Sequence, residues 1–462
     1  MSTSATAPPR PRTVLVGVQL PGVSEAELSS SLDELARLAK TLGLQIVARV
    51  TQRRDRLAPA AVVGEGKLKE LAALTGGSGI VPVGPPSKQR EEEAEREEAA
   101  QAAEAAAAEA GEAPAAKGAP RATVVVVDHE LSPSQARNLE RATGAEVLDR
   151  SAVILAIFQR HARSREARLQ VEIARLSYVA PRLRETGGRD RQGGGIGGRG
   201  AGESHLELDR RKLRDRIAEL REELASIERD AGTRRRRRGE FGTAALVGYT
   251  NAGKSSWMRA LTGSGVLVED KLFATLDTTI RALSPEATPR ILISDTVGFI
   301  KKLPHDLVAS FRSTLDEARD ADLLVQVADA ADPAFPAQIE VTREVLASLG
   351  ADESPRLLVL NKADRLEAVA REQLARDWPD ALLLSSRDPA DIAALRERIT
   401  AFFERDMVEE ELVVPYAQQR VVAEAHTTTH VLAESHDEHG TRLLLRAAPE
   451  ALARLRALLE KR

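Results

Sequence analysis

The residues from Gly248 to Ser255 have the types and the spacing that could hold a phosphate group. Their order is Gly-Tyr-Thr-Asn-Ala-Gly-Lys-Ser, the pattern of a phosphate-binding loop. Backbone N–H groups of such a loop can surround phosphate oxygens, Lys254 can reach the outer phosphates, and the Ser255 hydroxyl can ligate Mg²⁺. The alternative is a glycine-rich turn that binds nothing.

The elements on either side of this loop favour the phosphate interpretation. Residues 244–247 are Ala-Ala-Leu-Val, an apolar run that predicts a strand, and residues 256–261 predict a helix. A loop that opens a helix places free N–H groups and the positive end of the helix dipole next to the anion.

A second predicted strand ends in polar residues suited to a metal-bound phosphate. Residues 291–294 are apolar and lead into Asp295-Thr296-Val297-Gly298. An aspartate at a strand end beside a phosphate loop can hold Mg²⁺ through water. Gly298 lets its backbone N–H approach a γ-phosphate, because glycine has no side chain in the way.

A third and a fourth strand end predict recognition of guanine. Residues 357–360 lead into Asn361-Lys362-Ala363-Asp364. The Asp364 carboxylate can accept from the N1–H and the amino group of guanine, a pair of donors that adenine lacks. Lys362 would cover the base plane, and Asn361 would tie this strand end to the phosphate loop. Residues 382–384 end in Ser385 and Ser386, which are suited to backbone contact with guanine O6.

A threonine between the phosphate loop and Asp295 can add a second hydroxyl to Mg²⁺ while the γ-phosphate is present. The spacing does not choose among Thr275, Thr278 and Thr279. The order of these motifs, each after an apolar strand, predicts a domain that binds GTP and hydrolyses it to GDP and phosphate.

Phe299 occupies the position where many switch GTPases carry a water-orienting glutamine. A phenyl ring cannot orient water, and packing under a neighbouring loop explains the residue as well. We therefore expect slow hydrolysis that a partner or a monovalent cation completes. The Asn251 side-chain oxygen could hold K⁺ against the phosphates, so the predicted catalytic residues are Asn251, Lys254 and Gly298.

The remaining chain predicts three further parts. Strands alternating with helices over residues 13–143 indicate a small parallel α/β domain, and apolar residues at heptad-like spacing over 169–227 indicate an antiparallel helical hairpin. The predicted fold class is α/β: a P-loop GTPase domain with a parallel sheet flanked by helices, preceded by the smaller α/β domain and the hairpin, and followed by a small α+β domain. The predicted boundaries are 1–168, with a low-complexity acidic insertion at about 88–120, then 169–239, 240–405 and 406–462.

Two segments of the predicted hairpin are candidates for contact with RNA. Residues 187–202 form a glycine-rich loop, and five arginines run from Arg234 to Arg238. A flexible linker and a solvated helix face are the simpler interpretations, while a basic loop pressed against RNA phosphates is the sharper one. Gly193, Gly195 and Gly198 follow no strand, so a dinucleotide site is not expected there.

The composition excludes several classes of protein. The chain has 462 residues, a net charge of −4 and no cysteine, which rules out disulfides and thiolate metal sites. Residues 1–12 lack an apolar core, so we expect no signal peptide. No apolar run approaches ~18 residues, so we expect a cytoplasmic protein without a membrane span. The histidines near the C-terminus lack metal-ligand spacing.

The motifs together resemble the HflX family of ribosome-associated GTPases. The resemblance rests on the phosphate loop at 248–255, Asp-Thr-Val-Gly-Phe at 295–299, Asn-Lys-Ala-Asp at 361–364 and Leu-Phe-Ala-Thr-Leu-Asp at 272–277. It also includes three stretches outside the GTPase domain, at 64–67, 128–135 and 193–203. It extends over nearly the whole chain from about Thr13. It implies binding to the large ribosomal subunit and its rRNA and, as in some members, dissociation or rescue of stalled ribosomes under stress.

The resemblance also implies roles for particular residues. Thr275 would be the switch threonine on Mg²⁺, beside Ser255 and Asp295, and we expect a monomer. Thr278 stands where the family often has proline and Ser386 where alanine is usual, changes that leave nucleotide binding intact. The residues assigned to the nucleotide are Gly248, Tyr249, Thr250, Asn251, Ala252, Gly253, Lys254, Ser255, Phe273, Ala274, Thr275, Leu276, Asp277, Asp295, Thr296, Val297, Gly298, Asn361, Lys362, Ala363, Asp364, Ser385 and Ser386.

Two other functions remain open from the sequence. The protein could be an RNA-binding module that uses GTP only as a conformational timer, without splitting activity. It could also be an RNA-modifying or ATP-using enzyme with its site in the N-terminal domain. Only Gly64-Glu65-Gly66-Lys67 supports the second alternative, and a Gly-Lys turn that caps a helix explains those residues equally well.

Overall fold

The structure is a computed structural model, and its fold has two compact units. It describes residues 10–81, 121–183, 205–238, 241–263, 272–273, 279–287, 290–301 and 317–460. One unit comprises residues 1–160 and 171–219, and the other comprises 161–170 and 220–462. The predicted acidic insertion and the glycine-rich loop lie outside the described residues. The four predicted domain boundaries stay predictions.

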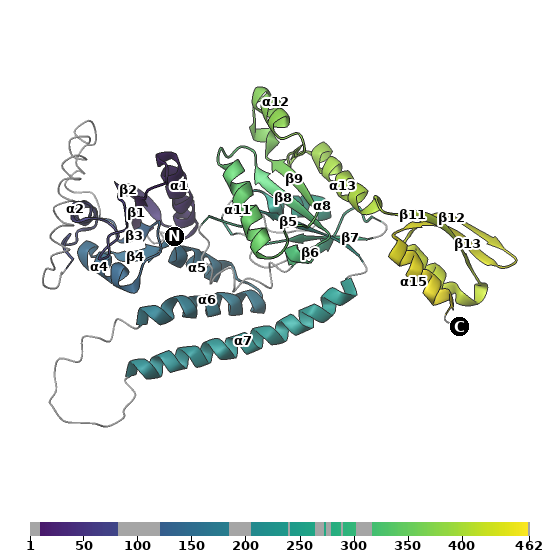
Figure 1. The fold of residues 1–462 in the computed structure, drawn as a ribbon, viewed down its shortest axis with the longest axis horizontal. Helices are drawn as coiled ribbons and strands as arrows, with labels where there is room; N and C mark the ends of the chain where they lie inside the picture. The colour runs from purple at the N-terminus through teal and green to yellow at the C-terminus, as the bar shows by residue number, and fades with distance from the viewer. Residues whose placement is uncertain are drawn as a thin grey trace, which may run out of the picture. The chain divides into compact units, whose positions relative to one another are not determined.

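A four-stranded parallel sheet forms the N-terminal part of the chain (Figure 1). Its order is β2-β1-β3-β4, with β1 (Arg12–Gln19), β2 (Gln45–Arg53), β3 (Val124–Val127) and β4 (Glu146–Asp149). The helices that connect or follow these strands are α1 (Glu25–Thr41), α2 (Glu65–Thr75), α4 (Pro133–Thr143) and α5 (Arg150–His161). The predicted small parallel α/β domain is confirmed, and it contains two elements that were not predicted, β4 and α5.

Both faces of this sheet are covered, because its strands are apolar on both sides. Val14 and Val16 belong to the same buried cluster as Leu68 and Leu71 of α2 and Leu139 of α4. On the opposite face α1 approaches β1 so closely that a Cβ on Gly17 would lie 3.1 Å from carbons of Leu28 and Leu32.

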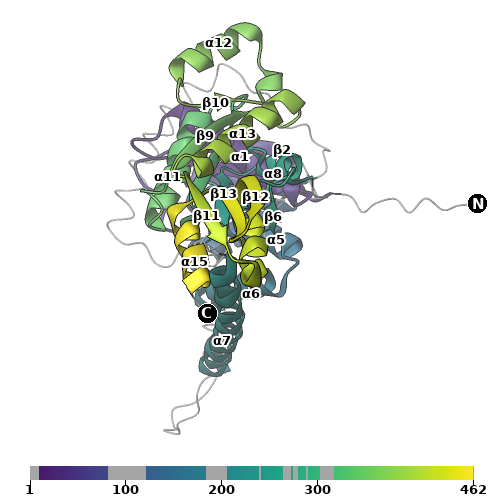
Figure 2. The same ribbon diagram turned by 90° about the vertical axis from the view of Figure 1, so that its right-hand side faces the viewer.

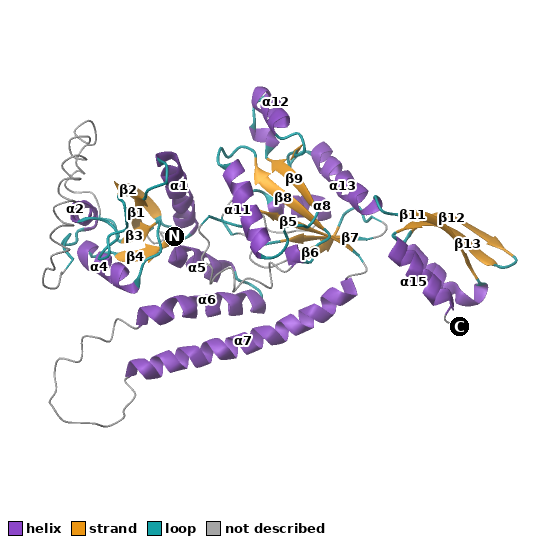
Figure 3. Cartoon of the chain, viewed as in Figure 1, coloured by secondary structure: helices purple, strands orange, loops and turns teal. Residues whose placement is uncertain are grey.

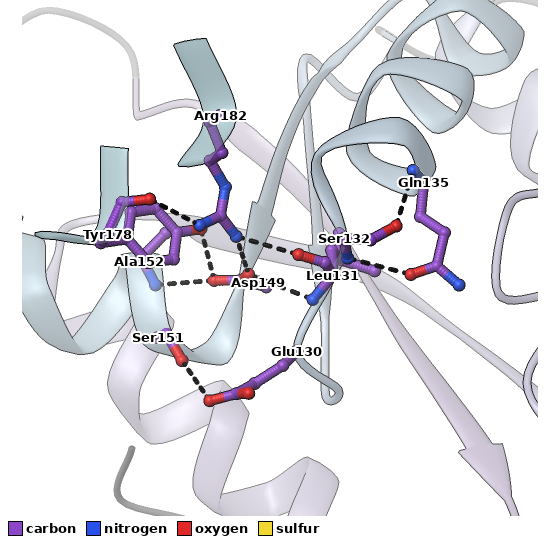
Figure 4. Close-up of polar contacts among 9 residues, drawn as sticks. All are labelled: Glu130, Leu131, Ser132, Gln135, Asp149, Ser151, Ala152, Tyr178 and Arg182. Atoms are coloured by element: carbon purple, nitrogen blue, oxygen red, sulfur yellow. Dashed lines mark hydrogen bonds and ion pairs between the residues drawn. The ribbon is translucent and has the colours of Figure 1, made fainter. Parts of the chain in front are cut away.

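Asp149, at the end of β4, joins the second half of helix α6 (Arg165–Leu183) to this sheet (Figure 4). Its side chain is 1% exposed and accepts hydrogen bonds from the Tyr178 hydroxyl at 2.8 Å and from Arg182 at 2.8 Å. It also accepts from the backbone N–H groups of Ala152 at 2.8 Å and Leu131 at 3.3 Å. The Arg182 guanidinium stacks 3.4 Å from the centre of the Tyr178 ring. We call Asp149 and the four residues that donate to it the Asp149 cluster.

Burial and the nearby Asp149 charge raise the pKa of the Tyr178 hydroxyl well above its usual range. The phenol is therefore neutral at neutral pH and donates to the carboxylate. A second buried carboxylate, Asp128 at the end of β3, is paired with Arg150 at 2.8 Å. Both strand-end aspartates of this sheet are thus held by arginines of the same unit.

Helices α6 and α7 (His205–Arg238) run antiparallel, as the two apolar seams predict (Figure 3). Arg165 pairs with Glu223 at 2.7 Å, and Glu172 pairs with Arg216 at 3.6 Å, so the numbering rises on one helix as it falls on the other. These exposed pairs indicate direction and contribute little stability. The side chains of the arginine run lie outside the described residues.

A six-stranded sheet forms the core of the second unit, with the order β10-β9-β8-β5-β7-β6. Five strands are parallel, and β6 pairs antiparallel with β7 at one edge. The strands are β5 (Gly242–Gly248), β6 (Thr279–Ala282), β7 (Ile291–Asp295), β8 (Leu323–Asp329), β9 (Arg356–Asn361) and β10 (Leu382–Leu383). The helices are α8 (Lys254–Thr262), α11 (Phe335–Ser348), α12 (Ala368–Asp377) and α13 (Pro389–Glu404).

Alternate residues of β5 show how the helices cover this sheet. Ala244 and Leu246 pack in one buried cluster with Trp257 of α8 and Leu395 of α13. Ala245 and Val247 point to the other face, into a cluster that includes Leu346 of α11. A sheet sandwiched by helices exposes its polar groups at the strand ends, where the chain leaves the core.

The C-terminal residues form a three-stranded antiparallel sheet with the order β11-β13-β12. The elements are β11 (Val408–Val414), α14 (Gln419–Thr428), β12 (His430–Asp437), β13 (Gly440–Ala447) and α15 (Pro449–Glu460). Helix α15 packs on one face through Leu452 and Leu455, which share a cluster with Leu443 and Leu445 of β13 (Figure 2). The predicted small α+β appendage is confirmed.

Candidate nucleotide site

The predicted phosphate loop connects β5 to α8, as the sequence indicates. Gly253 caps α8 with a φ of 104°, a left-handed conformation that favours glycine. A Cβ on Gly253 would lie 2.1 Å from Nδ2 of Asn361, so the loop needs glycine there on both counts. The Asn361 amide in turn donates to the Ala252 carbonyl at 2.8 Å. The third strand end is therefore fastened to the phosphate loop, as predicted for Asn361.

Lys254 is buried at the start of α8, with 6% of its surface exposed. Its ammonium donates to the carbonyl oxygens of Gly248 at 3.0 Å and Tyr249 at 2.8 Å. Burial lowers the pKa of Lys254 to about 8, and the charge of Asp295 opposes that shift. An anion close to Lys254 would favour its charged form, so this buried ammonium is suited to binding a phosphate.

The two described residues predicted to serve Mg²⁺ lie side by side. The Ser255 hydroxyl donates to the Asp295 carboxylate at 2.8 Å, although 40 residues separate them in the sequence. A hydroxyl and a carboxylate are the hard oxygen donors that Mg²⁺ prefers, so the donor set fits this ion. The third predicted ligand, Thr275, and the neighbouring Ala274, Leu276 and Asp277 lie outside the described residues. Phe273 is described and is buried, with a φ of 57°.

Gly298 lies directly against the phosphate loop. A Cβ there would be 2.8 Å from Cα of Thr250 and 2.9 Å from Nζ of Lys254, so no larger residue fits without displacing the loop. The preceding Thr296 hydroxyl donates to the carbonyl of Leu246 in β5 at 2.7 Å. The structure thus brings residues 295–298 beside the phosphate loop, as the sequence predicts.

Phe299 is 1% exposed, and its ring packs in the core cluster that contains Val247 and Leu324. A ring in that position cannot contact a water molecule in the nucleotide site. The packing interpretation of Phe299 is therefore the one that the structure supports.

The residues predicted to recognise the base also gather in one place. Lys362 has a left-handed φ of 64°, and its ammonium donates to the Asn251 carbonyl at 2.8 Å. The Ser386 N–H donates to the Asn361 side-chain oxygen at 3.2 Å. Ala363 is buried beneath them, and its N–H donates to Leu384. The contact of Ser385 and Ser386 with guanine O6 stays a prediction.

Asp364 stands at the edge of an open pocket of 350 Å³ that is also lined by Ser385, Arg371 and Arg387. The Ser385 hydroxyl donates to Oδ1 of Asp364 at 2.7 Å, and this bond holds the pKa of the carboxyl below its usual range. Arg387 is 3.7 Å from Oδ2 and is largely exposed. Asp364 is therefore an ionised acceptor that lines an open pocket, with a side chain that is 35% exposed.

Two aspartates near the nucleotide site were not predicted from the sequence. Asp329, the last residue of β8, accepts from the Lys362 ammonium at 2.6 Å, and Asp391 accepts from the Ser385 N–H at 2.8 Å. Each orients a residue that the motifs identified. The only sequence signal for Asp329 is its place at the end of an apolar run, which it shares with Asp295.

The Gly64–Lys67 turn has a structural role. Gly64 is the residue before α2, its N–H donates to the Gln52 side chain at 2.9 Å, and Lys67 pairs with Glu70 at 2.9 Å. The turn caps a helix, the simpler of the two interpretations that the sequence allowed.

Comparison with known proteins places the whole chain in one family. Residues 29–81 and 93–159 match the family described as GTP-binding GTPase N-terminal, and 161–238 match the GTP-binding GTPase middle region. Residues 243–362 match the family described as 50S ribosome-binding GTPase. The sequence is 57% identical over 458 residues to GTPase HflX of Gluconacetobacter diazotrophicus, covering 99% of this chain and 100% of that protein. The chain belongs to the HflX family of GTPases.

Other HflX proteins are also similar over most of their length. GTPase HflX of Escherichia coli K12 is 42% identical over 416 residues, covering 89% of this chain and 88% of that protein. Among solved structures, a GTP-binding protein from the archaeon Sulfolobus solfataricus in complex with GDP has a TM-score of 0.41 and 21% identity, covering 84% of this chain and 97% of that one. This likeness is too low for a comparison of site geometry.

The family membership makes the protein a GTPase, and the predicted family, fold class and enzyme activity are confirmed. Within the part of the chain that the structure describes, no helix has both the length and the apolar character needed to cross a bilayer.

Proposed function

We propose that this HflX-family GTPase is a switch that binds the large ribosomal subunit in its GTP state and dissociates stalled ribosomes under stress. The observation that carries the proposal is the match of residues 243–362 to the family described as 50S ribosome-binding GTPase. The nucleotide half of the proposal is supported by the contacts of Asn361, after β9, and of residues 295–298, after β7, with the phosphate loop.

In this proposal each part of the site has a defined task. The loop N–H groups and Lys254 bind the phosphates, and Gly298 offers its N–H to the terminal one. Asp364 accepts hydrogen bonds from the N1–H and the amino group of guanine. Ser385 orients Asp364, and Asn361 joins the segment 361–364 to the phosphate loop. Lys362 covers the base and is itself positioned by Asp329.

Ser255 and Asp295 would hold Mg²⁺, together with Thr275 as the resemblance implies. When bound there, the ion would neutralise charge on the phosphate oxygens. The hydroxyl and the carboxylate are hydrogen-bonded at 2.8 Å, so they are close enough for one cation to contact both once that hydrogen bond is broken.

Asn251 is the proposed site of help from K⁺. It has a left-handed φ of 62°, its side chain is exposed, and its carbonyl accepts from Lys362. Phe299 stands where many switch GTPases carry a glutamine that orients the attacking water. Because its ring is buried, Phe299 does not orient water, and K⁺ held by Asn251 would assist hydrolysis instead. GTP turnover measured in K⁺ and in Na⁺ tests this role: we expect faster turnover in K⁺, and equal rates would remove Asn251 from the catalytic set.

Co-sedimentation with ribosomal subunits through sucrose gradients tests the proposed function. We expect the protein to travel with the large subunit when loaded with a non-hydrolysable GTP analogue, and to remain at the top of the gradient with GDP. Equal association in both states, or none in either, contradicts the proposal.

The same gradients decide between a splitting factor and an RNA-binding module with a timer. Conversion of 70S ribosomes to subunits by the protein supports dissociation, and its occurrence with the analogue would show that binding energy drives it. Nucleotide-dependent association that leaves 70S ribosomes whole supports the module.

A further inference from the structure

Backbone hydrogen bonds join the segment that carries Gly298 to the phosphate loop. The Phe299 N–H donates to the Gly248 carbonyl at 3.1 Å, and the Thr250 N–H donates to the Phe299 carbonyl at 2.8 Å. These two bonds form an isolated parallel bridge between Tyr249 and Phe299. They involve backbone atoms alone, so any residue at position 249 could form them.

The Tyr249 side chain adds a third bond that only tyrosine can supply. Its hydroxyl accepts from the Lys301 N–H at 2.8 Å, two residues beyond the bridge. The side chain is buried, with 4% of the residue exposed, so the ring is fixed in place by packing. A phenylalanine would fill the same space and leave the Lys301 N–H without this acceptor.

The position of this loop matters because Gly298 has almost no clearance. A Cβ on Gly298 would lie 2.8 Å from Thr250 and 2.9 Å from Lys254. The Gly248 carbonyl accepts from both the Phe299 N–H and the Lys254 ammonium, so the docked loop and the lysine share one acceptor. A small displacement of residues 298–301 therefore moves the Gly298 N–H relative to Lys254.

We propose that Tyr249 is a positioning residue for GTP hydrolysis, whose hydroxyl holds residues 298–301 on the phosphate loop and so sets the place of the Gly298 N–H. The proposal rests on the proposed role of Gly298 at the terminal phosphate. Tyr249 acts through Lys301 and Gly298 and supplies no proton to the reaction. Because only GTP has the γ-phosphate that the Gly298 N–H would contact, the hydroxyl affects turnover and leaves the binding of GDP unchanged.

Tyr249→Phe tests this role in the full-length protein. A single hydrogen bond of this kind is worth about a two- to tenfold change in rate, so we expect kcat for GTP to fall by about that factor. The affinity for a fluorescent GDP analogue should stay at its wild-type value, and the melting temperature without nucleotide should fall by no more than a few degrees, roughly the cost of one hydrogen bond. The matched control is Tyr416→Phe, which removes a hydroxyl that donates to the Asp437 carbonyl in the C-terminal sheet. It should leave kcat unchanged.

Two results would overturn the inference. An unchanged kcat in Tyr249→Phe shows that the bond to Lys301 is not needed, and a parallel loss of kcat, GDP affinity and melting temperature shows that the hydroxyl only stabilises the fold. Both are distinct from failure of the proposed function. That failure would appear as wild-type protein that turns over GTP but does not associate with the large subunit in a nucleotide-dependent way.

Discussion

Two aspartates at the ends of parallel strands have opposite surroundings in this protein. Asp149, after β4, is 1% exposed and accepts from four donors of its own unit. Asp364, three residues after β9, has a side chain that is 35% exposed and one hydroxyl donor, Ser385. An aspartate near the carboxyl end of a parallel strand therefore belongs to a closed structural cluster in one unit and is an open acceptor in the other.

The number of donors that the protein itself provides explains the difference. The buried Asp149 carboxylate would be costly without Arg182 and Tyr178, and with them it has no capacity left for a ligand. Asp364 has fewer donors and lines an open pocket of 350 Å³. Loss of Asp149 should therefore affect stability, and loss of the nucleotide loops should affect affinity.

The largest effect is expected for Asp149→Asn. The asparagine amide replaces one accepting oxygen with an NH₂ donor. In one orientation this donor faces the donors of Arg182 and Leu131, and in the other it faces those of Tyr178 and Ala152, so two hydrogen bonds are lost either way. We expect a loss of about 3 kcal/mol in the free energy of unfolding. Chemical denaturation followed by circular dichroism measures it. GDP affinity should be unchanged, and a loss of affinity without a loss of stability would break the comparison.

Gly253→Ala should affect affinity instead. The new Cβ would meet Nδ2 of Asn361 in a backbone conformation that disfavours alanine, so the tie between the two loops is broken. We expect GDP affinity to fall by about 100-fold, or about 3 kcal/mol. Gly350→Ala is the matched control, because its φ of 73° imposes similar strain and nothing lies within 4 Å of its Cβ. It should leave the affinity unchanged, and an equal loss in both variants would contradict the proposed tie.

The pH dependence of nucleotide binding should follow Lys254. Its pKa of about 8 in the free protein means that the ammonium is charged below that pH and must take up a proton to bind phosphate above it. We expect GDP affinity to be constant below pH about 8 and to fall by up to about tenfold between pH 8 and 9. Titration of a fluorescent GDP analogue measures the change. An affinity that rises with pH over this range would contradict the role of Lys254.

The smallest effect is expected for Tyr178→Phe, which removes one of the donors to Asp149. The loss of one hydrogen bond should lower the free energy of unfolding by about 1 kcal/mol. Wild-type protein should also lose stability above pH about 10, because the unfolded tyrosine ionises there while the buried one does not. That loss should be smaller in the variant. Identical pH profiles would show that the hydroxyl is not part of the Asp149 cluster.

The sequence predicted the parts of this comparison that depend on local pattern. The phosphate loop, Asp295 and Asp364 each follow an apolar run, so their strand ends could be placed before the fold was known. Helix α7 was predicted because its apolar stripe continues over several turns. Parallel strand ends meet at one edge of a sheet, and this topology brought Ser255 and Asp295 together as expected.

The parts that escaped prediction depend on distant partners or on short elements. Strand β4 has four residues, too few to show a period, and Asp149 meets Arg182 across 33 positions of sequence. Strand β8 is interrupted by Gln326, which is 3% exposed and donates to the Ile339 carbonyl. A buried polar residue such as Gln326 interrupts the run of apolar residues that predicts a strand. The sequence therefore does not predict β8 or identify Asp329 at its end.

The recognition of guanine by Asp364 is the central claim, and Asp364→Asn tests it most directly. Because Ser385 holds Oδ1, the amide nitrogen of asparagine would take the place of Oδ2 and present a donor to the pocket. Xanthine carries a carbonyl where guanine carries its amino group, so it should become the better base. We expect GDP affinity to fall by about 100-fold and xanthosine diphosphate affinity to rise above it. An Asp364→Asn protein that still prefers GDP as strongly as the wild type would contradict the account.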